Sequence, residues 1–287
     1  MTRATAQVES ETAAERKARV DNHFSGLAAI YHEKNYETPV ERRQYPDILV
    51  RHHRILEMAD TRGGRMLDIG CGSGRLLFDL RQLGFQVFGV DYSSSMVAAS
   101  RALFRGRGAL PAPPLAVEDI ERLAFRDASF DMVVAAAVIE YLFTDENAIS
   151  EIHRVLRPGG AMIIAVRNAR NLSKPVVLAR NLLQALPGVG AIVRLTENVA
   201  KKARPAPSKP AMFPARYHSP RQFRKLLESK GFVIEDTVFY RFDVFPEMIK
   251  SRFPTFCIEV GRFLERFGRS PLRYFAGALV VKARKAV

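Results

Sequence analysis

The chain has 287 residues, of which 47% are hydrophobic and 26% charged, as in an ordinary soluble globular protein with one full α/β domain and an elaboration. Two isolated cysteines argue against a disulfide framework or a cysteine metal site and favour a reducing cytosol. The N-terminus lacks the apolar core of a signal peptide, and the longest apolar run, 132–139, is too short for a membrane span. We therefore expect a cytoplasmic protein.

Charge is distributed unevenly along the chain. Residues 167–287 hold 24 Lys and Arg against 8 Asp and Glu, whereas residues 1–166 hold 20 against 22. Such asymmetry predicts an anionic partner for the second half, namely a membrane surface, a nucleic acid or a phosphorylated substrate. Generic solubility charge is the alternative interpretation.

The first sixty residues are expected to be mostly helical. Residues 1–22 predict a frayed or loosely helical tail, and the segment from Phe24 to Asp60 predicts helix with breaks at Pro39 and Pro46. This second segment is rich in tyrosine and histidine, which either belong to a core or line a substrate site.

The most informative stretch, 67–74, reads Leu-Asp-Ile-Gly-Cys-Gly-Ser-Gly. An apolar strand is followed by three glycines at alternate positions, which allow backbone angles closed to other residues and let a ligand approach the main chain. The next helix points its free N–H groups at this loop. A dinucleotide-binding loop would need its third glycine at Arg75. The loop instead resembles motif I of the class I S-adenosylmethionine-dependent methyltransferases. We interpret Cys71 as a small residue that fits the turn, not as a nucleophile.

Later segments agree with this resemblance at the family's spacing. A strand over 86–91 ends in Asp91, whose carboxylate can accept hydrogen bonds from both ribose hydroxyls of a nucleoside, although NAD enzymes use a similarly placed acid. Glu118-Asp119-Ile120 resembles the signature in which an aspartate, here Asp119, receives the adenine amino group. Segments 132–142 and 152–160 resemble the family's fourth strand and the turn before its fifth.

The resemblance, in particular to type 11-like small-molecule and lipid methyltransferases, implies S-adenosyl-L-methionine as cofactor and no metal. It assigns ten residues to cofactor binding: Asp68, Gly70, Gly72, Gly74, Asp91, Tyr92, Met96, Asp119, Ile120 and Ala136.

Strands and helices alternate from residue 65 to residue 166, which is typical of βαβ units and a parallel sheet. Together with the resemblance, this predicts an α/β, Rossmann-like fold with a seven-stranded, mostly parallel sheet and helices on both faces. We divide the chain into an N-terminal helical tail and cap (1–60), a cofactor-binding core (61–167), a helical and loop insertion serving as substrate lid (168–217) and a C-terminal completion of the sheet (218–287).

Two segments of the second half bear on the partner. Residues 176–195 are apolar with two arginines, which suits a greasy or amphipathic acceptor. Between 253 and 267, phenylalanines recur at spacings of three and four and form one apolar helical face beside several arginines. A basic amphipathic helix can lie on an anionic bilayer. We slightly favour packing of this face on the sheet, because phenylalanine stripes are more often core.

The acceptor side is less well defined. Many related small-molecule methyltransferases have Glu-His where this chain has Glu140-Tyr141, and an ordinary tyrosine with a pKa near 10 is a poor base at neutral pH. The catalytic residue is therefore unknown, and the weak candidates are Tyr31, His32 and Tyr141.

The sequence predicts transfer of a methyl group to oxygen or nitrogen of a small-molecule or lipid-like acceptor by in-line displacement. Peripheral contact with an anionic membrane is a further expectation. Two alternatives stay open: an RNA methyltransferase that uses the basic half, and a non-catalytic protein that binds the cofactor or a partner.

Overall fold

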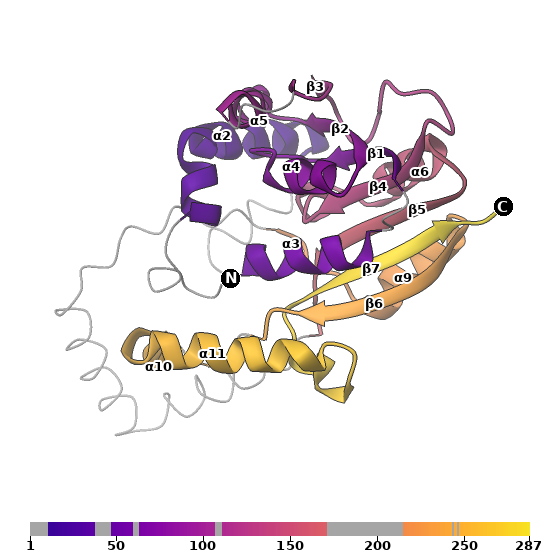
Figure 1. The fold of residues 1–287 in the computed structure, drawn as a ribbon. Helices are drawn as coiled ribbons and strands as arrows, with labels where there is room; N and C mark the ends of the chain where they lie inside the picture. Colours follow the sequence, from indigo (N-terminus) through magenta and orange to yellow (C-terminus); the bar gives the residue numbers. More distant parts are fainter. Residues whose placement is uncertain are drawn as a thin grey trace.

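The computed structural model describes residues 11–37, 47–59, 63–106, 111–170, 215–242, 244–245 and 247–287. Its centre is a seven-stranded sheet in the order β3-β2-β1-β4-β5-β7-β6 (Figure 1). Strands β1 to β5 run parallel, whereas β7 pairs antiparallel with β5 and with β6. The predicted α/β, Rossmann-like sheet is confirmed. The strands are β1 (Gly64–Ile69), β2 (Phe85–Asp91), β3 (Leu115–Val117), β4 (Phe130–Ala136), β5 (Leu156–Arg167), β6 (Phe232–Tyr240) and β7 (Ala278–Lys285).

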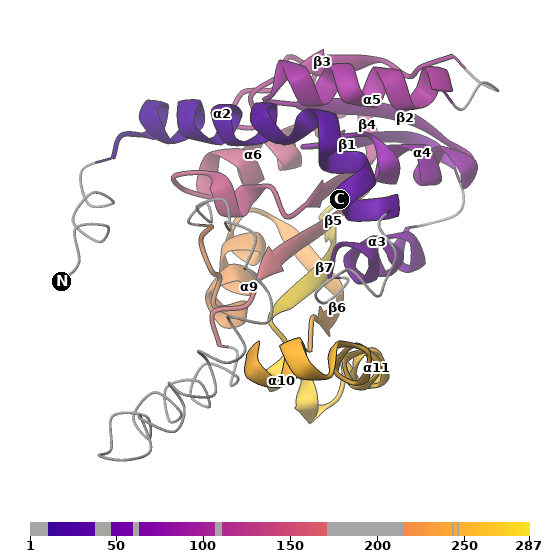
Figure 2. The same ribbon diagram turned by 90° about the vertical axis from the view of Figure 1, so that its left-hand side faces the viewer.

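Helices cover both faces of this sheet (Figures 1 and 2). On one face, β1, β4, β5 and β7 pack against α3, α4 and α5, and on the other they pack against α6 and α9. The helices are α2 (Ala13–His32), α3 (Asp47–Met58), α4 (Arg75–Gln82), α5 (Ser94–Gly106), α6 (Glu146–Val155), α9 (Pro220–Ser229), α10 (Glu247–Arg252) and α11 (Pro254–Leu264). Short helical turns are η1 (Glu33–Glu37), η3 (Ile139–Tyr141), η4 (Glu265–Phe267) and η5 (Pro271–Phe275).

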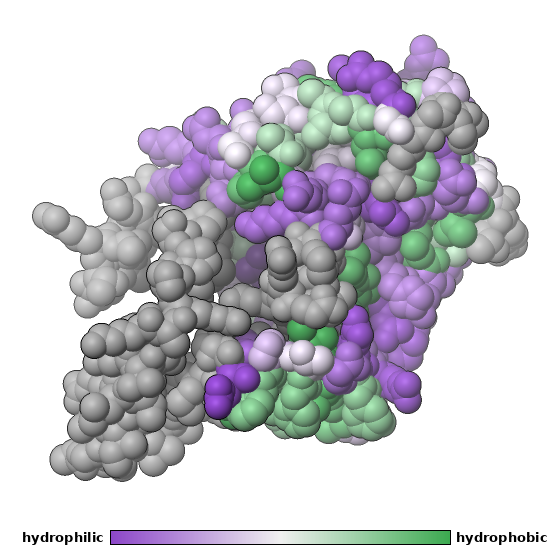
Figure 3. Space-filling model, turned by 60° about the vertical axis from the view of Figure 1, so that its left-hand side comes forward, coloured by the Kyte–Doolittle hydropathy of each residue, from purple (hydrophilic) through white to green (hydrophobic). Residues whose placement is uncertain are grey.

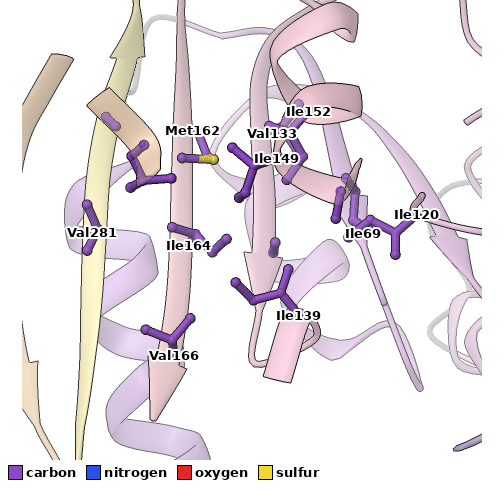
Figure 4. Packing of buried hydrophobic residues seen from close by; sticks show 14 of the residues in the cluster. Ile69, Ile120, Val133, Ile139, Ile149, Ile152, Met162, Ile164, Val166 and Val281 are labelled. Atoms are coloured by element: carbon purple, nitrogen blue, oxygen red, sulfur yellow. The ribbon is translucent and has the colours of Figure 1, made fainter. Parts of the chain in front are cut away.

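Successive side chains along each strand point to opposite faces of the sheet, which divides the core into these two layers. In β4, Val133 packs toward α6 while its neighbour Val134 packs toward the α3–α5 layer, and both side chains are fully buried. Figure 4 shows the layer on the α6 side, where Ile149 and Ile152 of α6 lie beside Val133. Strands that are apolar on both faces belong to a parallel sheet covered on both sides.

The N-terminal segment differs from its prediction. Residues 13–32 form one continuous helix, α2, instead of a loose tail followed by a helix from Phe24. A capping box fixes its start: the Thr12 side chain accepts from the Glu15 N–H, and the Glu15 side chain accepts from the Thr12 N–H. The first half of α2, residues 13–22, has five charged residues and only one large apolar residue, so its sequence shows no apolar face that would predict the helix.

Element boundaries differ more modestly elsewhere. Strand β5 begins at Leu156, inside the segment 152–160 that resembles the turn before the family's fifth strand. The apolar stretch 176–195 and the Pro- and Lys-rich stretch 201–214 lie outside the described residues. The proposed division into four segments stays a prediction.

Candidate active site

A cavity lies at the carboxyl ends of the parallel strands. Strand order reverses between β1 and β4, and the crevice at such a point is where ligands bind in open α/β sheets. The cavity has an empty volume of about 1270 Å³, including space open to solvent. The segments that follow β1, β2, β3 and β4 form its floor. Helix α2 forms its roof, and helix α3 contributes further lining residues.

The glycine loop forms part of the floor. The N–H groups of Gly70 and Cys71 donate to the carbonyl of Val90, which holds the end of β1 against β2. Gly70, Gly72 and Gly74 all have positive φ angles, of 69°, 52° and 80°. A Cβ at Gly72 would contact only Tyr31, at 3.9 Å, and would otherwise project into the cavity. The loop therefore brings bare backbone up to a ligand.

Gly74 has a different role from Gly72. A Cβ on Gly74 would lie 2.2 Å from the Ser100 hydroxyl of α5. The neighbouring helix, and not a ligand, therefore excludes a side chain at this position. Gly74 caps α4 from the left-handed region. It does not line the cavity, and we infer that it serves the loop's packing.

Asp91 lies at the end of β2 with both carboxylate oxygens held by backbone. Oδ2 accepts from the Gly72 N–H and Oδ1 from the Ser93 N–H, each at 2.9 Å. Burial raises the pKa of Asp91, and these two N–H groups partly offset that effect. The carboxylate lines the cavity and retains free lone pairs, so it is oriented to accept from a pair of hydroxyls.

Asp119 follows β3 and is bound to the roof of the cavity. The Lys17 ammonium group of α2 lies 2.6 Å from Asp119 Oδ2 and 2.5 Å from Glu121. Farther along α2, Phe24 packs edge-on against Tyr141, and the hydroxyls of Ser25 and Ser93 lie 2.8 Å apart. Helix α2 is thereby fixed across the mouth of the cavity.

Loss of the Lys17 ion pairs should loosen this roof. For Lys17→Ala we expect amide hydrogen exchange in the middle of α2 to accelerate roughly fivefold, the equivalent of about 1 kcal/mol for a small, partly screened charge network. Arg19→Ala, which removes an ion pair between the same helix and Glu11 just before it, is the matched control. Equal exchange in both variants would show that Lys17 does not hold the roof.

Asp68 is buried directly beneath the glycine loop. Its carboxyl group is 1% exposed, and neither oxygen has a hydrogen-bond partner among the described residues. Burial raises the pKa of Asp68 from its ordinary value of 3.8 to about 8, and the nearby Asp91 carboxylate adds to the rise, whereas Arg51 opposes it. Burial likewise raises the pKa of Cys71, which agrees with an inert thiol.

This shift makes folding stability depend on pH. Between about pH 4 and pH 8 the folded chain keeps a proton on Asp68 that the unfolded chain releases, so rising pH destabilises the fold through this window. Asp68→Asn removes the effect. The variant's gain in unfolding free energy over wild type should grow by up to about 1.4 kcal/mol per pH unit and level off above pH 8. Urea titrations across this range measure it, and a gain that does not vary with pH would contradict it.

The other end of the cavity is lined by arginines, tyrosines and one buried acid. Arg51 of α3 has no ion-pair partner among the described residues, whereas Arg167 donates to Glu140 Oε1 at 2.9 Å. Glu140 is 1% exposed, and its Oε2 has no partner among those residues. Burial raises the pKa of Tyr141 to about 12 and also raises that of Tyr31, so both phenols are neutral hydrogen-bonding groups.

The structure brings most of the predicted site residues together. The predicted residues that line the cavity are Gly70, Gly72, Asp91, Tyr92, Met96, Asp119, Ile120, Ala136, Tyr31 and Tyr141. Asp68 and Gly74 lie behind this surface. His32 does not line the cavity and lies beside Glu37. Sequence reasoning missed Lys17, Arg51, Glu140 and Arg167, which come from separate elements and share no local motif.

Known proteins resemble the part of the chain that builds this floor. Residues 67–164 match the family model described as "Methyltransferase domain". A phosphatidylethanolamine N-methyltransferase of Cereibacter sphaeroides is 36% identical over 118 residues, which is 41% of this chain and 58% of that protein. A ubiquinone biosynthesis O-methyltransferase of Bradyrhizobium sp. (strain ORS 278) is 38% identical over 128 residues, which is 44% of this chain and 49% of that protein.

The chain contains a methyltransferase domain of the class I, S-adenosylmethionine-dependent type over residues 67–164. It spans only about half the length of the curated relatives above, so their similarity concerns the cofactor-binding part. Among solved structures, magnesium protoporphyrin IX methyltransferase of Synechocystis PCC 6803 with bound S-adenosylmethionine superimposes with a TM-score of 0.58 at 16% identity, covering 96% of this chain and all of that one. The [4+2]-cyclase SpnF superimposes with a TM-score of 0.61 at 19% identity, over 94% and 97% of the two chains. These two similarities show the fold alone.

The residues present fit the family's cofactor, S-adenosyl-L-methionine. Asp91 offers paired acceptors for ribose hydroxyls, and Asp119 with Ile120 offers an acceptor and an apolar contact for adenine. At the other end, the Arg51 guanidinium lines the cavity and suits a carboxylate, and the Asp68 carboxyl group, buried behind the floor without a hydrogen-bond partner among the described residues, suits an ammonium group. An amino-acid end carries both of those charges.

Proposed function

We propose that this protein transfers the methyl group of S-adenosyl-L-methionine to an oxygen or nitrogen atom of a small-molecule or lipid-like acceptor. The cavity carries this proposal, because its lining combines residues suited to the cofactor with Glu140, Arg167 and the tyrosines. The relatives named for phosphatidylethanolamine and ubiquinone biosynthesis support the acceptor class.

The bound cofactor supplies an electrophilic methyl group on a sulfonium. The chain's residues then have to orient the acceptor atom in line with that group and exclude water. Tyr31 and Tyr141 wall the cavity as neutral phenols, so they orient an acceptor by hydrogen bonding and do not remove its proton.

Glu140 is the better proposal for a proton acceptor. It sits in η3, three residues after Ala137 with its strained φ of 60°, and Arg167 fixes one of its oxygens. The other oxygen, Oε2, is buried without a partner among the described residues, as expected of a group that receives a hydrogen bond from an acceptor O–H or N–H. No histidine in the described part of the chain lines the cavity.

A lipid-like acceptor brings with it a peripheral contact with anionic membranes. The positive charge of residues 167–287 supports this contact. None of the described helices has the length and apolar character needed to cross a bilayer.

Mass spectrometry of ligands stripped from the purified protein tests the proposed function. We expect S-adenosylmethionine or S-adenosylhomocysteine together with a lipid-like molecule, and calorimetry should show micromolar binding of S-adenosylhomocysteine without binding of NAD. Measurable NAD binding in place of S-adenosylhomocysteine would overturn the cofactor assignment. Salt-sensitive RNA binding without any lipid would favour the RNA methyltransferase alternative.

A further inference from the structure

Helix α11 turns its phenylalanine stripe outward. The expectation that this stripe packs on the sheet is wrong for Phe253, Phe256 and Phe263, because the buried side of α11 consists of Cys257, Ile258 and Gly261. Leu264, at the end of the helix, packs against the core as expected. On the outward side the rings of Phe253, Phe256 and Phe263 are 57%, 59% and 55% exposed. Figure 3 shows hydrophobic residues along the lower edge of the molecule, where α11 lies in Figures 1 and 2.

The turn η5 extends this apolar surface. Its exposed side chains include Leu272, Tyr274 and Phe275. We call the exposed residues of α11 and η5 the α11–η5 surface. A group of large aromatic side chains exposed to solvent usually marks a binding surface.

Positive charge accompanies the rings. Residues 247–275 hold six Lys and Arg against three Asp and Glu. Of the acids, Glu265 is buried and Glu259 lies 2.9 Å from Arg262, so the charge left at the surface is positive. Arg252 and Arg266 each lie within 6 Å of a phenylalanine ring, so ring and cation are presented together.

The α11–η5 surface is also fixed to the cavity. Glu265, at the end of α11, accepts from the backbone N–H groups of Arg241 and Phe242. Arg241 lines the cavity, as does its neighbour Tyr240. Arg54 of α3 donates to the Glu265 carbonyl at 2.8 Å. Hydrogen bonds therefore connect this surface directly to residues that line the cavity.

We propose that the α11–η5 surface docks the protein on an anionic lipid bilayer, with the rings inserted at the interface and the arginines on lipid phosphates. This inference rests on the proposed lipid-like acceptor, which a docked cavity would receive from the bilayer. A second copy of the chain fits the surface less well, since a two-fold contact would bring its excess positive charge against itself. An anionic bilayer matches both the rings and the charge.

Vesicle sedimentation of the full chain tests the proposal. The probes are vesicles of phosphatidylcholine alone and of phosphatidylcholine mixed with phosphatidylglycerol. Wild type should bind the mixed vesicles and keep part of that binding at about 0.5 M salt, where charge interactions between exposed groups are screened. Phe256→Ser combined with Phe263→Ser should lower partitioning at least tenfold in high salt. Val233→Thr, at an exposed apolar position on β6, should leave it unchanged.

The same samples are tested for S-adenosylhomocysteine binding by calorimetry, which separates this inference from the proposed function. Retained cofactor binding with lost vesicle binding in the Phe256/Phe263 variant supports the docking surface. Vesicle binding equal to wild type in that variant, or wild-type binding abolished by salt, overturns it even if the cofactor binds. If wild type binds no vesicles but forms a dimer, and the Phe256/Phe263 variant is monomeric, the surface binds a second copy of the chain instead.

Discussion

Gly72→Val is expected to abolish measurable binding of S-adenosylhomocysteine. The Gly72 backbone has a φ of 52°, and the space beyond its missing Cβ is cavity, closed only by Tyr31 at 3.9 Å. A branched side chain would fill the volume that the cofactor needs and would also resist the left-handed turn, at a cost of about 1–2 kcal/mol. The steric effect on the ligand, not this strain, makes the expected loss complete.

Gly84→Val is the matched control for backbone strain. Gly84 also has a positive φ, of 93°, and a Cβ there would meet no atom of the described residues within 4 Å. Both variants should lose similar thermal stability, but only Gly72→Val should fail to bind in calorimetry. If the Gly72 variant binds like wild type, the loop does not contact the cofactor. If Gly84→Val also fails to bind, strain alone explains the loss.

The floor of the site was predictable because it is local in sequence. Gly70, Gly72, Asp91 and Asp119 each follow the end of a strand, and parallel strands bring their carboxyl ends to one edge. The regular alternation of strands and helices predicted the sheet for the same reason. Each motif needs only its own strand–turn–helix unit to form.

The walls of the site were not predictable, because their residues come together only in the folded chain. Lys17 and Asp119 are 102 positions apart, and Arg167 and Glu140 are 27 apart. No spacing rule joins α2 to the loop after β3. The function of Glu140 also depends on which of its oxygens is left without a partner, which is a property of packing.

The orientation of α11 shows a different limit. Its phenylalanines have the spacing of a buried face, and hydrophobic periodicity identifies such a face without saying what covers it. The buried side of α11 carries the smaller residues Cys257 and Gly261 with Ile258, whereas the rings of Phe253, Phe256 and Phe263 point outward.

Asp91→Ala should weaken binding of S-adenosylhomocysteine by about 2–3 kcal/mol, or roughly 30- to 150-fold, the scale for losing charge-assisted hydrogen bonds to two hydroxyls. Part of this loss comes from the loop, because the Gly72 N–H loses its acceptor as well. Asp91→Asn keeps one carbonyl acceptor and should fall between the alanine variant and wild type.

Asp119→Ala is the internal comparison for Asp91 and should cost less, about 1 kcal/mol, since a single hydrogen bond to a carboxylate already paired with Lys17 is lost while Ile120 still packs at the adenine position. Removing Asp119 also breaks its ion pair with Lys17. Lys17 then pairs with Glu121 alone, so helix α2 is held less firmly. Calorimetry with S-adenosylhomocysteine ranks the three variants. If Asp91→Ala binds as tightly as wild type, another residue binds the ribose hydroxyls. The prediction that Asp91 contributes more to cofactor binding than Asp119 would then be wrong.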